Sequence, residues 1–310
     1  MDNVIEVSGL RQAYGSLVAV DDVSLAVGAG EVFGILGPNG AGKTTTVESI
    51  AGLRRPDAGT VRVLGLDPQR DGRRLRQRLG VQLQHAVLPD RLKVWEALQL
   101  FASFYQSPVD WRRLLDQWDL TEKGDATFAS LSGGQRQRLF IALALVGRPD
   151  VVILDELTGG LDPQARRATW KLVRDIRDAG TTVVLVTHFM DEAEHLCDRL
   201  VILDEGRVVA RGSPHALVGA LEVQARVRFT APDPEVDLGL LAEVAGVLHV
   251  TVDRGDVAVD GRGPILAGVA AALAEHGIHP ADLRTEQPHL EDVYLSCTGK
   301  HLVTASGDGR

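Results

Sequence analysis

Eight residues near the amino terminus have the types and spacing of a phosphate-binding loop. The pattern G-x-x-x-x-G-K-[ST] is matched in full by Gly37, Pro38, Asn39, Gly40, Ala41, Gly42, Lys43 and Thr44. Glycines let a backbone turn tightly around a polyanion, so that its N–H groups and the positive end of the following helix converge on a phosphate. The loop therefore predicts that the chain binds a nucleoside triphosphate.

Two side chains of this loop would add a charge and a metal ligand. Lys43 would place a positive charge between the β- and γ-phosphates, and the Thr44 hydroxyl, followed by Thr45, would offer oxygen to Mg²⁺. The alternative is a glycine-rich surface turn with a solvated lysine. An apolar run over 31–36 predicts a buried strand before the loop, and residues 44–50 predict a helix after it, which favours the phosphate site.

A pair of carboxylates follows a second apolar run. Residues 151–154 predict a buried parallel strand that ends in Asp155 and Glu156. Asp155 would hold the hydration shell of Mg²⁺, and Glu156 would accept a proton from the attacking water. By itself such a strand end is more often solvated, but the phosphate loop upstream favours the catalytic interpretation.

A third motif lies between these two and consists of Leu131, Ser132, Gly133, Gly134 and Gln135. It opens a predicted helix that runs to residue 145, so Ser132 would cap that helix and its N–H groups would attract an anion. With the three motifs in this order, the chain resembles the nucleotide-binding subunit of ABC transporters over residues 3–220. The resemblance implies a P-loop NTPase cassette of the α/β class that binds ATP and Mg²⁺ and hydrolyses ATP.

The resemblance gives roles to further residues, each with a structural alternative. Tyr14 would stack on adenine, unless it is a half-buried strand tyrosine. Gln84 would sense Mg²⁺ and the γ-phosphate in catalysis, and Gln82 is the competing residue. We favour Gln84 because Val81 and Leu83 are expected to alternate inward, with Gln84 at the strand end; a solvated glutamine is the alternative.

Two residues downstream complete the predicted site. Asp162 would lie in a loop that crosses a dimer interface, or in a simple turn in which Pro163 starts a helix. His188, after the apolar run 181–187, would contact the γ-phosphate, although a lone histidine at a strand end is more often structural. One departure from the family is Leu157, where proline commonly follows the catalytic glutamate.

Composition narrows the class of protein. The 310 residues are 45% hydrophobic and 24% charged, which is ordinary for a globular protein, and no run of 18 apolar residues or export signal is visible. The net charge of −9 disfavours nucleic acid as a partner, and the two scattered cysteines fit a reducing cytosol. The basic run 70–78 predicts an amphipathic helix with a solvated face; contact with anionic lipid or an acidic partner loop is the alternative.

A change in the sequence pattern near residue 220 indicates two domains. We predict an ATP-binding domain over 1–220 with a helical subdomain at about 85–148, a small α+β domain over 221–300 and a disordered tail at 301–310. The second domain is expected to contain strands at 223–229 and 248–252, a hairpin turn at 253–256 and a helix at 265–276. Residues 91–117 predict one helix whose core stripe contains Trp95, Leu98, Phe101, Phe104 and Tyr105.

The resemblance also implies a mechanism and partners. Two copies would form an ATP-dependent homodimer, with each ATP held between Lys43 of one copy and Ser132 of the other. The dimer would drive a separate polytopic membrane subunit from the cytoplasmic face of the membrane, docked through residues 85–94. Residues 286–295 resemble the tail of drug- and antibiotic-exporting systems, which favours export of hydrophobic small molecules over import. The alternatives are a soluble ABC-type ATPase that acts on ribosomes or DNA, and a nucleotide switch without turnover.

Overall fold

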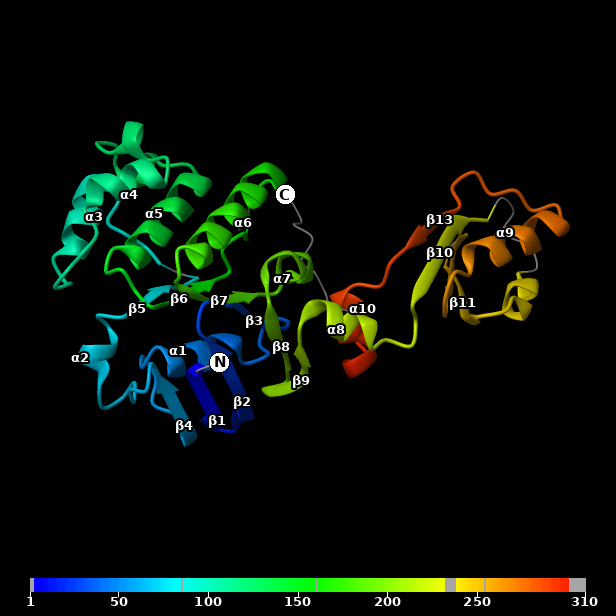
Figure 1. Ribbon diagram of the computed structural model, residues 1–310, viewed down its shortest axis with the longest axis horizontal. Coiled ribbons are helices and arrows are strands. Elements are labelled where there is room, and N and C mark those ends of the chain that lie inside the picture. The colour runs from blue at the N-terminus through cyan, green and yellow to red at the C-terminus, as the bar shows by residue number, and fades with distance from the viewer. Residues whose placement is uncertain (1–2, 85, 160, 232–237, 254, 301–310) are drawn as a thin grey trace. The chain divides into compact units, whose positions relative to one another are not determined.

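The chain forms two compact units, seen in Figure 1. The computed structural model describes residues 3–300 apart from 85, 160, 232–237 and 254. The predicted tail, residue 85 of the predicted docking segment and residue 160, just before the predicted interface residue Asp162, therefore lie outside the described residues. The first unit runs to Pro214 and the second begins at His215. Each unit is described below by itself.

A six-stranded sheet lies at the centre of the first unit. Five of its strands, β3, β5, β6, β7 and β8, run parallel, and the edge strand β9 is antiparallel to its neighbour β8. In sheet order the strands are β5 (Leu79–Gln82), β6 (Val151–Asp155), β7 (Thr182–Thr187), β3 (Val32–Leu36), β8 (Arg199–Asp204) and β9 (Arg207–Gly212). Every residue of β3, β6 and β7 is buried, as expected when helices and a second sheet cover a parallel sheet. The predicted α/β class is confirmed.

The register of this sheet brings its carboxyl ends to one edge. Leu36 pairs with Thr187, and Asp155 pairs with Val186. The phosphate loop after β3, the acids at the end of β6 and His188 after β7 therefore emerge side by side, where open α/β sheets bind their ligands.

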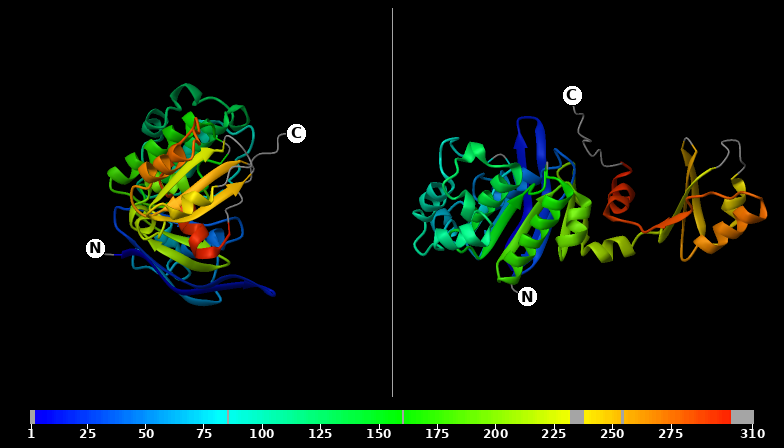
Figure 2. Two further views of the ribbon diagram at one scale, coloured as in Figure 1. Left: turned by 90° about the vertical axis from the view of Figure 1, so that its right-hand side faces the viewer. Right: turned by 90° about the horizontal axis from the view of Figure 1, so that it is seen from above.

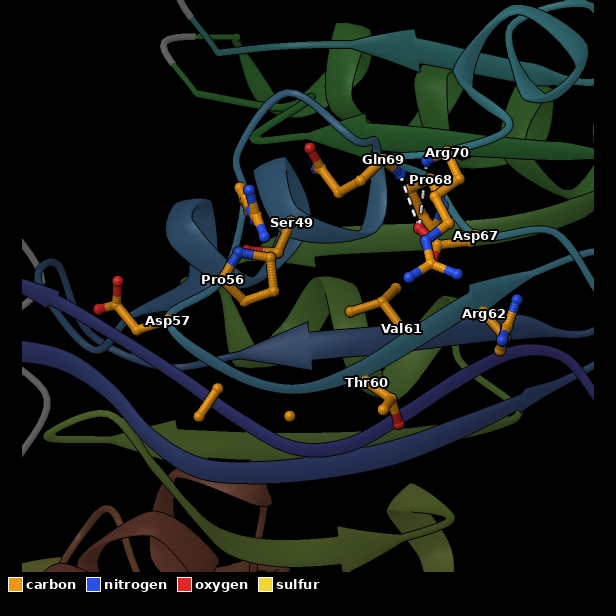
Figure 3. A pocket seen from close by; sticks show the side chains of 13 residues that line it. Ser49, Pro56, Asp57, Thr60, Val61, Arg62, Asp67, Pro68, Gln69 and Arg70 are labelled. Atoms are coloured by element: carbon orange, nitrogen blue, oxygen red, sulfur yellow. Dashed lines mark hydrogen bonds and ion pairs between the residues drawn. The ribbon is translucent and has the colours of Figure 1, made fainter.

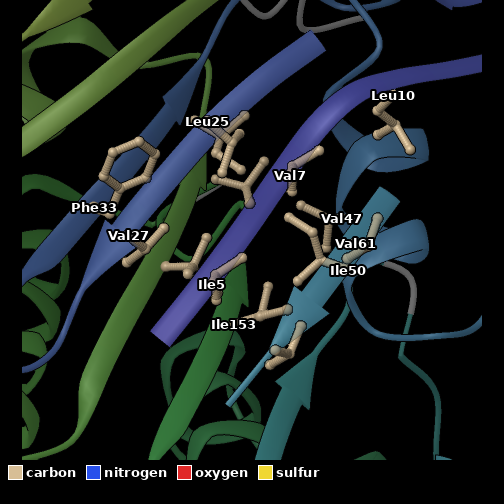
Figure 4. Close-up of a cluster of buried hydrophobic side chains, with 14 of the residues drawn as sticks. Ile5, Val7, Leu10, Leu25, Val27, Phe33, Val47, Ile50, Val61 and Ile153 are labelled. Atoms are coloured by element: carbon tan, nitrogen blue, oxygen red, sulfur yellow. The ribbon is translucent and has the colours of Figure 1, made fainter. Parts of the chain in front are cut away.

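A second, antiparallel sheet covers the first unit on one side. It has the order β2-β1-β4, formed by Leu17–Gly28, Asn3–Tyr14 and Ala58–Val63. Figure 4 shows the core that joins it to the central sheet and to α1 (Lys43–Ile50): apolar side chains of both sheets and of the helix pack together, among them Ile5, Val27, Phe33, Val47 and Ile153. Each such fully buried side chain contributes about 1.5–3 kcal/mol, so this core fixes the base of the phosphate loop.

Helices gather at another end of the first unit, as Figures 1 and 2 show. The single helix predicted over 91–117 is wrong: α3 ends at Ala102 and α4 begins at Trp111, with Pro108 between them. As a result Phe104 leaves the helical face and is 62% exposed, while Leu98 is buried as predicted. These helices are α3 (Val94–Ala102), α4 (Trp111–Gln117) and α5 (Gly133–Leu145).

The basic run also differs from its prediction. The helix α2 covers only Gly72–Leu75, a single turn. Leu79 belongs to β5 and pairs with Val151, so the chain must straighten before it. The remaining helices of this unit are α6 (Pro163–Asp178) and α7 (Met190–Leu196), with α8 (Pro214–Gly219) at the unit boundary.

The second unit has its own sheet and core. Its antiparallel strands have the order β11-β12-β10-β13, formed by Val247–Asp253, Asp256–Gly261, Ala225–Thr230 and Arg284–Glu286. The predicted hairpin is present, since Asp253 pairs with Asp256. Helix α9 (Leu266–Glu275) covers this sheet, and Arg226 of β10 joins α10 (Leu290–Thr298) through an ion pair of 2.9 Å to Asp292.

Candidate functional site

The phosphate loop owes its shape to glycines that no other residue can replace. Gly37 has φ 151°, and a Cβ on it would meet the Leu203 carbonyl oxygen at 2.2 Å. Gly42 has φ 96°, and its Cβ would meet the Ala19 carbonyl oxygen at 2.5 Å. The backbone of the loop therefore packs directly against the backbones of β2 and β8, and this close contact fixes the direction of the loop N–H groups.

Lys43 lies inside this loop. Only 5% of its surface is exposed, and its Nζ donates hydrogen bonds to the carbonyl oxygens of Gly37 at 2.8 Å and Pro38 at 2.9 Å. Burial lowers the pKa of the ammonium, and the carboxylates of Glu156 and Asp155 oppose that shift. The cation thus lies between the loop and the two acids, where a bound phosphate would meet it.

The start of α1 is open to an anion. The helix has Gly42 as its N-cap with no side-chain cap, and no acidic residue in its first turn. Its first N–H groups and its positive end consequently have no negative side chain to satisfy them. Thr44 is exposed at this end, with Thr45 beside it.

The structure brings the three predicted catalytic residues together. Glu156 Oε1 lies 3.1 Å from His188 Nδ1, and Gln84 Nε2 donates to Glu156 Oε2 at 2.5 Å. Glu156 itself has a left-handed φ of 51° and donates its N–H to the Val186 carbonyl oxygen at 2.8 Å. A carboxylate held from both sides by a histidine and an amide has the arrangement of an oriented general base.

The two competing glutamines have different roles. Gln82 is 5% exposed, and its Oε1 accepts a hydrogen bond from the Asp155 N–H at 3.2 Å, so it supports the strand end. Gln84 contacts Glu156. The predicted inward alternation of Val81 and Leu83 is wrong, however. Strand β5 already ends at Gln82, which is buried, while Val81 and Leu83 are half-buried.

Tyr14 ends β1 beside the phosphate-loop helix. Its hydroxyl is 3.3 Å from Thr45 Oγ1, and 42% of the residue is exposed. The guanidinium of Arg54 lies 4.9 Å from the ring centroid and pairs with Glu48 at 2.7 Å. Arg54 was not predicted from the sequence, because no motif contains it. Tyr14 is thus a partly exposed aromatic side chain in contact with the helix that follows the loop.

The Ser132 motif forms a capping box at the start of α5. Ser132 Oγ accepts from the Gln135 N–H at 3.3 Å, and Gln135 Oε1 accepts from the Ser132 N–H at 3.0 Å, which confirms the predicted cap. A Cβ on Gly133 or Gly134 would meet nothing within 4 Å, and neither has a left-handed φ. Leu131, the first residue of the motif, is buried. Within the described chain, therefore, neither packing nor backbone geometry requires these two glycines.

The segment after Glu156 is anchored at both ends. Leu157, in the usual place of proline, is 1% exposed and packs inward. Asp162 Oδ1 accepts from the N–H groups of Gln164 and Ala165, both at 2.9 Å, and Pro163 is the first residue of α6. The start of the helix at Pro163 agrees with the structural alternative, the cap formed by Asp162 was not predicted, and the role of Asp162 toward nucleotide stays a prediction.

The donor set near the loop fits Mg²⁺. Asp155 is 1% exposed at the end of β6, and the Thr44 hydroxyl and Gln84 amide supply the other predicted oxygens. Mg²⁺ prefers such hard ligands, and it usually takes one or two from the protein and the rest from phosphates and water. Among the described residues no group of three His, Cys, Asp or Glu side chains is placed to hold a metal.

A groove of about 510 Å³ opens elsewhere, beside the carboxyl end of α1, and is shown in Figure 3. Arg55, Arg62 and Arg70 line it, the last of them 3.9 Å from Asp67. No predicted nucleotide-site residue lines this groove. Its chemistry is separate from that of the phosphate loop.

Comparisons with known proteins agree with this geometry. Residues 20–159 match the family model described as ABC transporter. The Nod factor export ATP-binding protein I of Ralstonia nicotianae is 37% identical over 304 residues, 96% of this chain and 95% of that protein. The daunorubicin resistance ATP-binding protein DrrA3 of Streptomyces coeruleorubidus is 38% identical over 310 residues, 96% of each chain.

Solved structures show the same fold. The structure of an ATP binding subunit of an ABC transporter superimposes with a TM-score of 0.63 at 32% identity, covering 69% of this chain and 91% of that one. The structure of cbiO1 from Clostridium perfringens, part of the ABC transporter complex cbiONQ, has a TM-score of 0.63 at 28% identity, covering 71% and 92%. This chain therefore belongs to the ABC transporter ATP-binding proteins and is an ATPase of that family.

Proposed function

We propose that this chain powers an ABC exporter of drugs or other hydrophobic small molecules through a separate polytopic membrane subunit. The observation that carries the proposal is similarity along almost the whole chain to two proteins named for export of Nod factor and for daunorubicin resistance. The carboxyl-terminal residues 286–295 support the same class. The chain would act at the cytoplasmic face of the membrane; among the described residues, no helix is both long and apolar enough to cross a bilayer.

In the proposed mechanism the loop holds the triphosphate and the acids act on water. The N–H groups of the phosphate loop and Lys43 bind the β- and γ-phosphates, and Tyr14 stacks on adenine. Glu156 accepts a proton from the attacking water while Gln84 and His188 orient its carboxylate. Mg²⁺, bound by Thr44, Asp155 and Gln84, would neutralise charge that develops on the phosphates.

The proposed active form is a dimer of this chain. The Ser132 motif carries two glycines that nothing within the described chain requires, and the first turn of its capped helix contains no acidic residue that would repel an anion. Glycines keep such a surface free of side chains, so that the backbone can approach a ligand closely. We propose that the ligand is the ATP on the phosphate loop of a second copy, with Asp162 beside the same interface.

The domains and the docking surface complete the proposal. Residues 1–220 would form the ATP-binding domain, with its helical subdomain at 85–148, and residues 221–300 an accessory domain. Val87 is 80% exposed and lies three residues after Gln84, which contacts Glu156. Docking of the membrane subunit on residues 85–94 would consequently act on the catalytic carboxylate through a short segment.

The test is transport by a reconstituted pair. The chain is produced with the membrane protein encoded beside it, placed in vesicles, and given ATP and a fluorescent hydrophobic amine. We expect the two proteins to co-purify, and the amine to leave the compartment that holds the ATPase when ATP is present. With the Glu156→Gln chain we expect no movement of the amine. Co-isolation with ribosomes or DNA in place of the membrane protein would support the soluble class, which the net charge of −9 and these relatives disfavour.

A further inference from the structure

One buried carboxyl group near the site takes no part in the mechanism above. Glu192 lies on α7 and is 0% exposed. Burial raises the pKa of its carboxyl group, and hydrogen bonds from the side chains of Thr187, Thr158 and Trp170 oppose the rise. Ionisable side chains are almost never fully buried without a role or a partner, so this position needs a physical reason.

The polar atoms around Glu192 form a buried cluster. The carboxyl oxygens of Glu192, Thr158 Oγ1 and Trp170 Nε1 are all buried, and the side chains of Thr158, Thr187 and Trp170 lie within hydrogen-bonding reach of the carboxyl group, although not in ideal geometry. Thr187 Oγ1 accepts from the Phe189 N–H at 3.0 Å. A buried polar atom that loses its partner costs about 1–3 kcal/mol, so the members of this cluster must stay near one another in the folded chain.

The segments that meet at Glu192 are the ones that carry the catalytic pair. Thr158 lies two residues after Glu156, and Thr187 directly precedes His188. Glu156 and His188 are 3.1 Å apart, at the ends of two neighbouring strands. A single carboxyl group between Thr158 and Thr187 can therefore set how close those two ends come.

We infer that Glu192 is a positioning residue for the Glu156 and His188 pair: its carboxyl group joins the segment after β6 to the end of β7. It touches neither ATP nor the attacking water. When the cluster closes its hydrogen bonds, the carboxylate of Glu156 is held against His188. Without those bonds the two segments would be free to move apart. The inference rests on the catalytic roles proposed for Glu156 and His188.

The test separates positioning from folding. Glu192→Leu keeps the volume and removes the polar bridge, whereas Glu192→Gln keeps a group that can bond to both hydroxyls. In full-length chain with excess Mg²⁺ and ATP, we expect Glu192→Leu to lower kcat roughly 10²-fold, because misplacement of a reacting group has effects of that size, with the KM for ATP unchanged. Glu192→Gln is expected to restore most of kcat.

Two further variants make the result decisive. Glu194→Leu removes the same group from a half-buried position of α7 and is expected to leave kcat unchanged. Thr158→Val in combination with Glu192→Leu is expected to cost no more than Glu192→Leu alone, because both break one bridge. A Glu192→Leu chain with normal kcat overturns the inference, as does a Glu192→Gln chain that fails equally.

The proposed catalytic roles are tested in parallel. An active Glu156→Gln chain would overturn the role of Glu156 itself. An inactive Glu156→Gln chain beside a fully active Glu192→Leu chain would overturn only the positioning role. If Glu192→Leu lowers the melting temperature and raises KM together with the loss of kcat, the carboxyl group serves folding and the inference fails.

Discussion

At the scale of the residue, Glu156 is the proposed general base. Its left-handed backbone turns the side chain toward His188 and Gln84, which hold both carboxyl oxygens. We expect Glu156→Gln to lower kcat for ATP hydrolysis by about 10²–10⁴-fold, the usual contribution of a general base, with ATP affinity retained. Steady-state hydrolysis and fluorescent-nucleotide binding check this. Glu222→Gln, on the exposed surface, is the control, and equal losses in both variants would refute the role.

Lys43 makes a second prediction at this scale, about pH. Burial lowers its pKa in the folded chain below the ordinary value of 10.5, so between the two pKa values the unfolded chain binds more protons. The nucleotide-free chain must then gain stability from this group as the pH rises toward 10.5. We expect the free energy of unfolding of the natural chain to increase relative to Lys43→Met over that window. Urea unfolding at a series of pH values measures it, and an opposite slope would show that the acids outweigh burial.

At the scale of the element, the strands were predictable and the long helix was not. Buried parallel strands consist of continuous apolar residues, so β3, β6 and β7 and the residues at their ends could be found from the sequence. The helix over 91–117 could not, because an apolar periodicity continues past Ala102 although Pro108 interrupts the chain. The cluster around Glu192 was also invisible, since Thr158, Thr187 and Trp170 are brought to it only by the packing of α6 and α7 on the sheet.

The phosphate loop gives a prediction at the element scale. Gly42→Ala would force a Cβ to within 2.5 Å of the Ala19 carbonyl oxygen at a left-handed φ of 96°. Strain of that kind costs of order 1–3 kcal/mol, and the helix α1 would have to shift with the loop. We expect a lower melting temperature and weaker ATP binding. Gly133→Ala is the matched control: its Cβ meets nothing within 4 Å, so its stability should be unchanged or slightly raised.

At the scale of the whole molecule, the two units have separate cores and the site belongs to the first. That site contains the phosphate loop and the proposed general base. Its third motif, however, carries glycines that the described chain itself does not need. In the proposed dimer these glycines are needed by the second copy and not by the chain that carries them. Such a need is a property of the assembly, so neither the sequence pattern nor the structure of a single chain can establish it.

The dimer is tested most directly by mixing two inactive chains. Lys43→Ala destroys the phosphate loop and leaves the Ser132 motif, whereas Gly134→Ala leaves the loop and places a methyl group on the open surface of that motif. In a two-fold dimer each site takes its loop from one copy and its motif from the other. In an equal mixture about half of all dimers contain one copy of each variant, and one of the two sites in such a dimer is intact, so roughly a quarter of the natural sites should return. Hydrolysis that recovers on mixing supports sites shared between copies. If each variant alone is inactive and the mixture stays inactive, while both still bind each other, the site would have to be complete within one chain.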